Sequence, residues 1–265
     1  MSNWLVAALL GLIEGVTEFL PVSSTGHLLL AEHYCLRAGW LGTQPSELFN
    51  VVIQSGAVLA VLLVFTERVR SLAAGWREPE ARAYLLRLAV AFGVTGVGGL
   101  TLKKLGLKFP ETPAPVAWAT LVGGVLFIGL ERWLRGRPTT ERVTWGMALA
   151  VALAQLLAAS FPGTSRSGAT ILVALALGLS RPAATEFSFL LGIPTLLAAG
   201  AKETLDALRD GTPHEPWSMI GVALAVAALS AFVVVRWLLG YVRSHTFEPF
   251  GWYRVVLGVA ILAFL

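Results

Sequence analysis

Two interrupted stretches decide the fold, and the first runs Glu14-Gly15-Val16-Thr17-Glu18-Phe19-Leu20-Pro21-Val22-Ser23-Ser24-Thr25-Gly26-His27. It breaks an apolar helix that starts near Asn3, and a short apolar segment, residues 28–36, follows it. The second stretch, Pro162-Gly163-Thr164-Ser165-Arg166-Ser167-Gly168, separates the apolar residues 144–161 from residues 169–179. Irregular backbone at membrane depth is tolerated only where protein or a water-filled cavity surrounds it. We therefore predict that each stretch is the tip of a re-entrant helical hairpin, which enters and leaves the membrane on one side.

The composition places the whole chain in a membrane. Hydrophobic residues make up 56% of the 265 residues and charged residues only 14%, against about 45–50% and about 25% in soluble domains. Cys35 is the single cysteine, so no disulfide framework can form within the chain. The net charge of +4 comes from basic residues in short gaps between apolar segments, which is typical of topology-setting loops. The sequence thus indicates an all-α polytopic membrane protein with no nucleic-acid partner.

The remaining apolar segments predict six transmembrane helices, because a span needs about 20 apolar residues. They are residues 49–65, 85–102, 114–130, 184–205, 217–239 and 250–265. After each interrupted stretch we expect a helix that begins with a glutamate, Glu47 and Glu186 respectively. This similarity predicts one integral membrane domain, residues 1–265, built from two repeats of about residues 1–140 and 141–265. An odd number of spans in each repeat inverts the second repeat relative to the first. The two hairpin tips then meet near the midplane, where transporters of this architecture bind their substrates.

The arginines and lysines between the spans predict the orientation. The loops of one side hold Arg68, Arg70, Arg77, Arg82, Arg132, Arg135, Arg137, Arg142, Arg181 and Arg243, whereas those of the other side hold Arg37, Lys103, Lys104, Lys108 and Arg209. Because the side richer in positive charge is normally cytoplasmic, we expect both termini on the outer side.

The first hairpin carries two carboxylates in an apolar helix. Charged side chains at membrane depth are costly, so those that occur there are candidates for function. Glu14 and Glu18 are four residues apart and share a helix face. Two such carboxylates can share a divalent cation or a proton, or one of them can act as a base. A polar seam between helices is the structural alternative.

The residues after Pro21 have the properties of an anion site. Ser23, Ser24 and Thr25 supply hydroxyl donors where a helix starts, and His27 lies three residues after Ser24. The free N–H groups of a helix start attract anions. A plain helix cap with a packed histidine is the structural alternative.

The second interrupted stretch adds a positive charge. The guanidinium of Arg166 would bind phosphate oxygens in bidentate fashion, unless it only forms a structural ion pair with Glu14 or Glu18. Small and hydroxyl residues around it would allow the backbone and side chains to approach the substrate; these candidates are Gly163, Thr164, Ser165, Ser167, Gly168 and Thr170.

Together these motifs resemble the undecaprenyl-pyrophosphate phosphatases, also called bacitracin-resistance proteins. The resemblance rests on residues 14–27 and 161–170, extends to residues 51–54 and 186–191, and covers essentially the whole chain. It implies a phosphoric anhydride hydrolase of the bacterial inner membrane, which removes the terminal phosphate of undecaprenyl pyrophosphate and recycles the lipid carrier for cell-wall synthesis. It further implies a polyprenyl pyrophosphate lipid as partner, a site open to the periplasm, and a divalent cation, Mg²⁺ or Ca²⁺. The acid-phosphatase-like lipid phosphatases do not fit, because Leu172 stands where their Ser-Arg motif requires a histidine.

For the reaction we expect Ser24 as the nucleophile and Glu18 as its base, with Arg166 holding the diphosphate. Glu14 would orient Glu18 or share a metal ion with it. His27 as nucleophile or proton donor, and direct attack by water, are the alternatives that the sequence leaves open. It also leaves open a homodimer. A different class of function, a secondary transporter or flippase for a phosphorylated lipid, is the alternative to hydrolysis, because inverted repeats with broken helices are typical of transporters.

Overall fold

The computed structural model describes residues 3–106, 112–210 and 215–265, so Lys108 of the charge analysis lies outside the described residues. Within these ranges the chain is helical, with an isolated bridge between Thr140 and Leu179. The helices are α1 Asn3–Thr17, α2 Ser24–Arg37, α3 Glu47–Val64, α4 Thr66–Ala74, α5 Pro79–Lys104, α6 Pro113–Trp133, α7 Trp145–Ser160, α8 Arg166–Ala176, α9 Arg181–Asp210, α10 Trp217–Tyr241 and α11 Glu248–Phe264. The all-α prediction is confirmed.

Five of the described helices, α3, α5, α6, α9 and α10, are long and apolar enough to cross a membrane. They correspond to five of the six predicted spans, and the chain is a polytopic membrane protein. The sixth predicted span is α11, which has 17 residues and at 1.5 Å per residue is about 26 Å long. It is therefore somewhat shorter than the apolar layer of a typical bilayer, about 30 Å.

In both interrupted stretches, the second helix begins earlier in the chain than the apolar pattern predicts. α2 begins at Ser24 rather than near residue 28, and α8 begins at Arg166 rather than near residue 169. The reason is a serine cap before each helix. Ser23 Oγ accepts a hydrogen bond from the Gly26 N–H at 3.3 Å, and Ser165 Oγ accepts one from the Gly168 N–H at 3.1 Å. These caps hold the first turn of each helix without apolar contacts.

The same two serines have an unusual backbone. Ser23 has φ 75° and Ser165 has φ 67°, and among the described residues they are the non-glycine residues with positive φ. Such conformations are strained for L-residues and tend to persist at functional sites, where the surrounding structure holds them. The two hairpin tips are therefore built in the same way.

One expectation about a helix start is wrong. Glu47 begins α3, but Glu186 lies in the second turn of α9, which begins at Arg181. Glu186 instead accepts hydrogen bonds from Arg68 Nε at 2.8 Å and from the Tyr84 hydroxyl at 3.3 Å. The Ser180 side chain and the turn before α9 start this helix early, because the Ser180 hydroxyl accepts a hydrogen bond from the Ala183 N–H.

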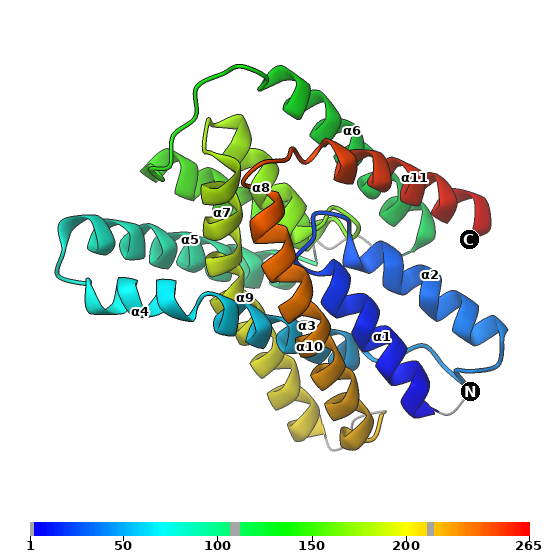
Figure 1. Cartoon of the computed structure of the whole chain (residues 1–265). Coiled ribbons are helices and arrows are strands. Elements are labelled where there is room, and N and C mark those ends of the chain that lie inside the picture. Colours follow the sequence, from blue (N-terminus) through cyan, green and yellow to red (C-terminus); the bar gives the residue numbers. More distant parts are fainter. Residues whose placement is uncertain (1–2, 107–111, 211–214) are drawn as a thin grey trace.

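Helices far apart in sequence lie side by side in the fold. α6 packs along α11, α1 packs along α10, and α3 lies between α10 and α9 (Figure 1). Glycines permit close approach of α1 and α10. A Cβ on Gly11 would lie 2.2 Å from the Ala223 carbonyl oxygen, and a Cβ on Gly15 would lie 2.2 Å from the Ala227 carbonyl oxygen. This packing fixes the helix that carries Glu14 and leads to Glu18.

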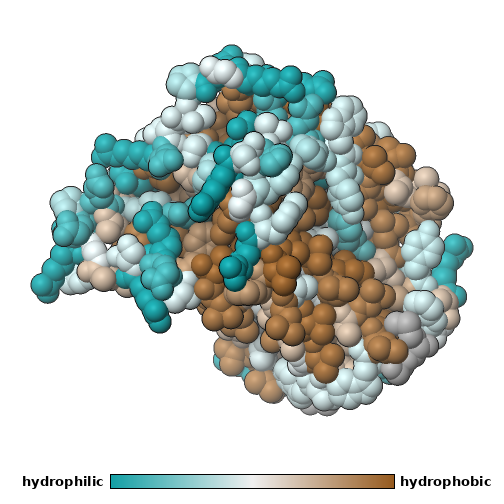
Figure 2. Space-filling model, viewed as in Figure 1, coloured by the Kyte–Doolittle hydropathy of each residue, from teal (hydrophilic) through white to brown (hydrophobic). Residues whose placement is uncertain are grey.

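The outer surface of the spans is apolar. Large side chains remain exposed on several of them, with Leu63 at 66%, Val97 at 70% and Leu229 at 72% relative exposure. Figure 2 shows apolar residues in a broad continuous area, with hydrophilic residues gathered toward other parts of the same view. A water-soluble monomer rarely exposes apolar patches of this extent, so this surface fits contact with lipid.

Candidate active site

The tips of the two interrupted stretches meet inside the protein. Glu18 follows the end of α1, Ser24 begins α2, and Arg166 begins α8. The Ser167 hydroxyl is within hydrogen-bond distance of the carbonyl oxygens of Glu18 at 3.2 Å and Leu20 at 3.1 Å, which ties one tip to the other. Residues about 150 positions apart in sequence thus form one site.

Glu18 is the centre of this site. Ser24 Oγ donates a hydrogen bond to Glu18 Oε2 at 2.9 Å, while Arg166 Nε and Nη2 each lie 3.3 Å from Glu18 Oε1. The side chain of Glu18 is 7% exposed and that of Arg166 is 12% exposed. Because the pair lies largely out of water, its charges interact strongly. The ionised carboxylate faces a hydroxyl proton on one side and a cation on the other.

The guanidinium of Arg166 is held in a fixed position by the segment after α1 and by α9. It lies 5.1 Å from the centre of the Phe19 ring, and Nη1 is 3.4 Å from the Ser188 carbonyl oxygen on α9. A Cβ on Gly192 would lie 2.4 Å from Nη1, so a glycine is required to make room for the group. A planar cation fixed in this way can bind a second anion without rearranging.

Ser167 and Thr170 stabilise the second tip through hydrogen bonds of their hydroxyl groups. The Thr170 hydroxyl is 2.8 Å from the Arg166 carbonyl oxygen and 2.6 Å from Ser188 Oγ. Ser167 Oγ also lies 3.2 Å from Ser165 Oγ. Ser167 and Thr170 are fully buried. In this arrangement their hydroxyls bond to protein atoms, and they hold the start of α8 in place.

Ser23, Gly163 and Thr164 lie where the tips approach α6 and α11. Thr120 Oγ1 is 3.3 Å from Ser23 Oγ and 3.2 Å from the Gly163 carbonyl oxygen. Gly163 has φ 90°, and a Cβ there would lie 2.4 Å from the Val116 carbonyl oxygen. The carbonyl oxygens of Gly163 and Thr164 accept hydrogen bonds from Arg254. The backbone of both tips is thus tightly packed.

His27 points to a different partner. Its Nδ1 is 2.7 Å from the Ser23 carbonyl oxygen, and its Nε2 is 2.7 Å from the Tyr253 hydroxyl, on which the ring also stacks. A carbonyl can only accept, so Nδ1 carries the proton and Nε2 accepts from Tyr253. The described contacts of His27 do not include Glu18, Ser24 or Arg166. Thr25, the residue before Gly26, is half-buried at the start of α2.

Glu14 is the most enclosed carboxylate of the site. It is fully buried on α1, and neither carboxylate oxygen has a hydrogen-bond partner among the residues that the structure describes. It interacts electrostatically with Glu18 and Arg166. A buried carboxylate without donors is costly, so the position suits a proton or a cation between Glu14 and Glu18. The described residues contain no cluster of three or more His, Cys, Asp or Glu side chains that could hold a metal alone.

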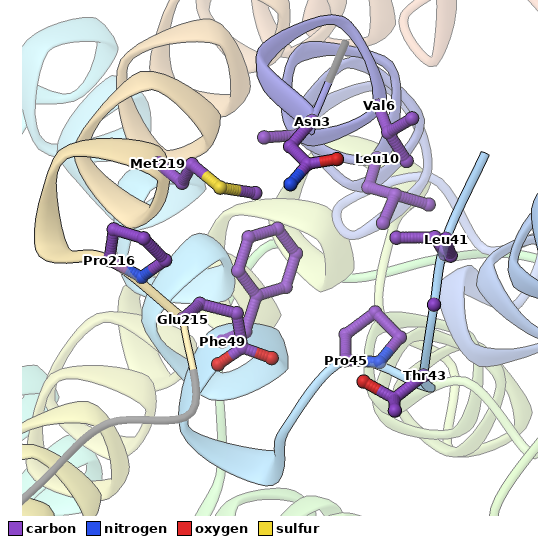
Figure 3. A pocket seen from close by; sticks show the side chains of 12 residues that line it. Asn3, Val6, Leu10, Leu41, Thr43, Pro45, Phe49, Glu215, Pro216 and Met219 are labelled. Carbon is purple, nitrogen blue, oxygen red and sulfur yellow. The ribbon is translucent and has the colours of Figure 1, made fainter. Parts of the chain in front are cut away.

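A separate cavity of about 260 Å³ lies at the outer starts of α1, α3 and α10. Val6, Leu10 and Phe49 form apolar walls, and the Glu215 carboxylate lies at its edge (Figure 3). Ser46 fixes that carboxylate, because its N–H and its hydroxyl donate to the two Glu215 oxygens at 2.7 and 2.5 Å. None of the predicted site residues lines this cavity.

Sequence reasoning missed four residues that shape the site: Thr120, Ser188, Gly192 and Arg254. Arg254 had a usable signal, because an arginine within the apolar residues 250–265 is itself a charge at membrane depth. Ser188 lies within the recognised residues 186–191 and Gly192 directly follows them, but they act through a carbonyl oxygen and through the room that a glycine leaves. The residue types alone do not indicate that either one faces Arg166.

Comparison with known proteins gives one consistent result. The family described as bacitracin resistance protein BacA matches residues 7–260. The chain is 49% identical to an undecaprenyl-diphosphatase of Rhizobium etli, over 98% of this chain and 96% of that protein. It is 48% identical to an undecaprenyl-diphosphatase of Xylella fastidiosa over the full length of both chains. An undecaprenyl-diphosphatase of Xanthomonas axonopodis pv. citri is 49% identical over 100% of this chain and 98% of its own.

Proposed function

The chain belongs to the family of the bacitracin resistance protein BacA, and from this membership we propose how its site hydrolyses undecaprenyl diphosphate. The enzyme is an undecaprenyl-diphosphatase, as are its full-length relatives by name. The substrate is therefore a polyprenyl diphosphate lipid, and the products are the lipid monophosphate and inorganic phosphate. This assignment favours hydrolysis over the transporter or flippase alternative.

The hydrogen bond from Ser24 to Glu18 is the observation that carries the proposed mechanism. A serine hydroxyl is a poor nucleophile until a neighbouring base accepts its proton. Glu18 Oε2 lies 2.9 Å from Ser24 Oγ, which is within the range required for that transfer. Arg166 lies 3.3 Å from the other carboxylate oxygen and holds Glu18 in the orientation that this transfer requires.

The chemistry follows from these positions. Ser24 Oγ attacks the terminal phosphorus while its proton moves to Glu18, and the bond between that phosphorus and the bridging oxygen breaks. The lipid monophosphate leaves and takes that proton from Glu18, so a phosphoserine remains and Glu18 is again a base. Water then attacks the phosphorus of the phosphoserine while Glu18 accepts a proton from the water. The bond between that phosphorus and Ser24 Oγ breaks, Glu18 returns the proton to Ser24 Oγ, and inorganic phosphate is released. Arg166 and the free N–H groups at the starts of α2 and α8 stabilise the charge on the transferred group.

The structure favours Ser24 over His27 as the nucleophile. In the neutral imidazole of His27, Nε2 accepts a hydrogen bond from the Tyr253 hydroxyl on α11, and the Nδ1–H donates to the Ser23 carbonyl oxygen before α2. Both nitrogens thus already have partners in the protein. Direct attack by water on the diphosphate remains the second mechanism, with Glu18 as the base for the water.

Glu14 and Glu18 are the residues that would hold a divalent cation. The unpartnered oxygens of Glu14 fit this role, and Mg²⁺ is commonly bound by one or two carboxylates together with substrate phosphates. Such an ion would supply charge neutralisation for the diphosphate. Without the ion, Glu14 would share a proton with Glu18.

The pattern of helix contacts supports an inverted repeat of about residues 1–140 and 141–265. In such a repeat, α1, α2, α3, α5 and α6 of the first half correspond, in that order, to α7, α8, α9, α10 and α11 of the second half. The contact of α1 with α10 then corresponds to the contact of α7 with α5. The contact of α3 with α10 corresponds in the same way to the contact of α9 with α5. The pairs α3–α9 and α6–α11 exchange with themselves, and all of these contacts occur. We propose six spans, including α11, and two re-entrant hairpins in the bacterial inner membrane. The site would open to the periplasm.

Replacement of Ser24 tests the nucleophile. We expect Ser24→Ala to lose nearly all release of phosphate from undecaprenyl diphosphate, while the lipid still binds. Ser71→Ala, the same change at an exposed position on α4, is the control and should keep full turnover. Acid quenching with substrate labelled in the terminal phosphate should trap phosphoserine in the unaltered enzyme. Near-normal turnover of Ser24→Ala would contradict the role, and lost turnover without phosphoserine would assign the attack to water.

Removal of divalent cations tests the proposed metal. Purified enzyme in detergent should lose phosphate release when a chelator is added and regain it with Mg²⁺ or Ca²⁺. Glu14→Gln should raise the concentration of added cation needed for half-maximal activity, because it removes one carboxylate of the pair. Full activity in the chelator would remove the cation from the mechanism and leave the proton-sharing role for Glu14.

A further inference from the structure

Arg254 on α11 is a buried cation without a carboxylate partner among the described contacts. Its side chain has no exposed surface. All of its described hydrogen bonds go to main-chain carbonyl oxygens: Nε to Thr120 at 3.1 Å, Nη1 to Pro21 at 3.3 Å, and Nη2 to Ala119 at 3.3 Å, Gly163 at 3.3 Å and Thr164 at 3.0 Å. By contrast, the buried Glu131 at the other end of α6 pairs with Arg181. A charge at this depth is costly, so its unusual set of partners requires an explanation.

The partners of Arg254 come from both hairpin tips. Pro21 lies two residues before the strained cap Ser23, and Thr164 lies directly before the strained cap Ser165. A single guanidinium therefore holds the backbone just ahead of the two residues with positive φ. The remaining partners, Ala119 and Thr120, anchor the group to α6. A cation that only joined α6 to α11 would not need the carbonyl groups of either tip.

The space around the guanidinium is made by glycines. A Cβ on Gly123 would lie 2.2 Å from Nη2, and a Cβ on Gly168 would lie 3.0 Å from Nη1. Gly123 is on α6 and Gly168 is in the first turn of α8, so both of these helices leave room for this one group. The fit is specific to a planar fork with five donors, which lysine cannot reproduce.

We propose that Arg254 is the positioning residue of the reaction: it clamps the two hairpin tips together, so that Ser24 and Glu18 on one tip face Arg166 on the other. This inference rests on the proposed function of the site. Arg254 does not touch the reacting groups. It acts through the carbonyl groups of Pro21 and Thr164, whose fixed positions set where α2 and α8 begin. A displacement of about 1 Å between reacting groups can lower a rate by about 100-fold.

Gly123→Ala tests the clamp while keeping every proposed catalytic residue and Arg254 itself. The new methyl group would collide with Nη2. Gly129→Ala on the same helix is the matched control, because a Cβ at Gly129 meets no atom within 4 Å. We expect Gly123→Ala to lower kcat for phosphate release by about 100-fold and to change KM by less than about threefold, because the diphosphate contacts remain while their alignment is lost. Gly129→Ala should keep both constants.

Arg254→Lys distinguishes the clamp from a simple need for charge. Lysine keeps the positive charge but cannot reach both tips, so kcat should stay low. Recovery of kcat by lysine would overturn the proposal, as would unchanged kcat in Gly123→Ala or a change confined to KM.

Amide hydrogen exchange provides a readout that does not depend on activity. In Gly123→Ala and Arg254→Lys, peptides covering residues 18–26 and 161–168 should both exchange faster, whereas peptides from α3 and α10 should not. Protection retained at both tips, or a uniform loss across the whole protein, would overturn the clamp. If the proposed function itself is wrong, the unaltered enzyme will release no phosphate from undecaprenyl diphosphate. The exchange experiment will still decide whether Arg254 holds the two tips together.

Discussion

At the scale of single residues, the guanidinium of Arg166 has to interact with two anions, the Glu18 carboxylate and the phosphate of the substrate. The guanidinium stabilises the ionised Glu18 at 3.3 Å, and in the proposed reaction it also holds the phosphate. Its planar fork can serve both anions at once because Nε, Nη1 and Nη2 point in different directions. Nη1 reaches the Ser188 carbonyl oxygen at the long distance of 3.4 Å, so this nitrogen is the one best able to turn to a phosphate oxygen.

Arg166→Lys should therefore be severe although it conserves the charge. A charge-assisted hydrogen bond contributes about 1.5–3 kcal/mol, so loss of one such contact in the transition state lowers kcat/KM by about 10- to 100-fold. Phosphate release measures this directly. Arg181→Lys is the control, since it disturbs another arginine–glutamate pair, that of half-buried Arg181 with buried Glu131, away from the site. It should lower thermal stability and leave kcat intact. A mild effect of Arg166→Lys would argue against bidentate contact with phosphate.

The sequence could indicate Glu18, Ser24 and Arg166 for a physical reason. Each is a polar group in an apolar segment, where its cost demands a role, and the structure brings the three together. Arg254 carried the same signal, yet its partners are backbone carbonyls that belong to every residue. A pattern of side chains cannot locate such a contact. The same limit applies to Gly192, where the relevant property is the absence of a Cβ beside Arg166.

At the scale of elements, the site depends on how closely α1 approaches α10. Gly11 and Gly15 are four residues apart and form one face, which is the small-residue spacing that lets membrane helices pack backbone to backbone. Their neighbours across the interface are main-chain oxygens of Ala223 and Ala227, which cannot rotate away as a side chain would. α1 carries Glu14 and continues directly into the tip with Glu18.

Gly11→Ala should separate these two helices. Its Cβ would lie 2.2 Å from the Ala223 oxygen, and overpacking of this kind costs about 1–3 kcal/mol. We expect a lower unfolding temperature in detergent, together with lower phosphate release because Glu14 and Glu18 move with α1. Gly93→Ala on α5 is the matched control, since a Cβ there meets no atom within 4 Å. Equal unfolding temperatures for the two variants would contradict this account of the interface.

The elements that the sequence missed or misplaced share one cause. α4 has nine residues, three of them charged, so neither length nor hydropathy marks it as a helix. α9 begins five residues before Glu186, because the turn at Ser180 starts it rather than the apolar pattern. Hydropathy identifies the segments that contact lipid, whereas the positions at which α4 and α9 begin depend on local hydrogen bonds. The long spans were found because their length and apolar character are both required by the bilayer.

At the scale of the whole molecule, charge and the inverted repeat must agree on one orientation. The loops between α3 and α5 and between α6 and α7 are rich in arginine, and the same side also holds Arg181 at the start of α9 and Arg243 between α10 and α11. On the positive-inside rule these loops face the cytoplasm. The first hairpin then enters from the periplasm and the second from the cytoplasm, so their tips can meet only if both are re-entrant. The direct contacts of Ser167 with the carbonyl oxygens of Glu18 and Leu20 fit this arrangement.

Cysteine labelling tests this orientation with two exposed positions. Gln44 lies between α2 and α3, and Thr139 lies between α6 and α7; both are exposed. In a Cys35→Ala background, which removes the native thiol, a membrane-impermeant maleimide added to the periplasmic side should label Gln44→Cys and spare Thr139→Cys until the membrane is opened. If the labelling is reversed, the site opens to the cytoplasm. If both positions are labelled from the periplasm, the first repeat crosses the membrane an even number of times between them. The inverted repeat would then be wrong even though the two tips remain in contact.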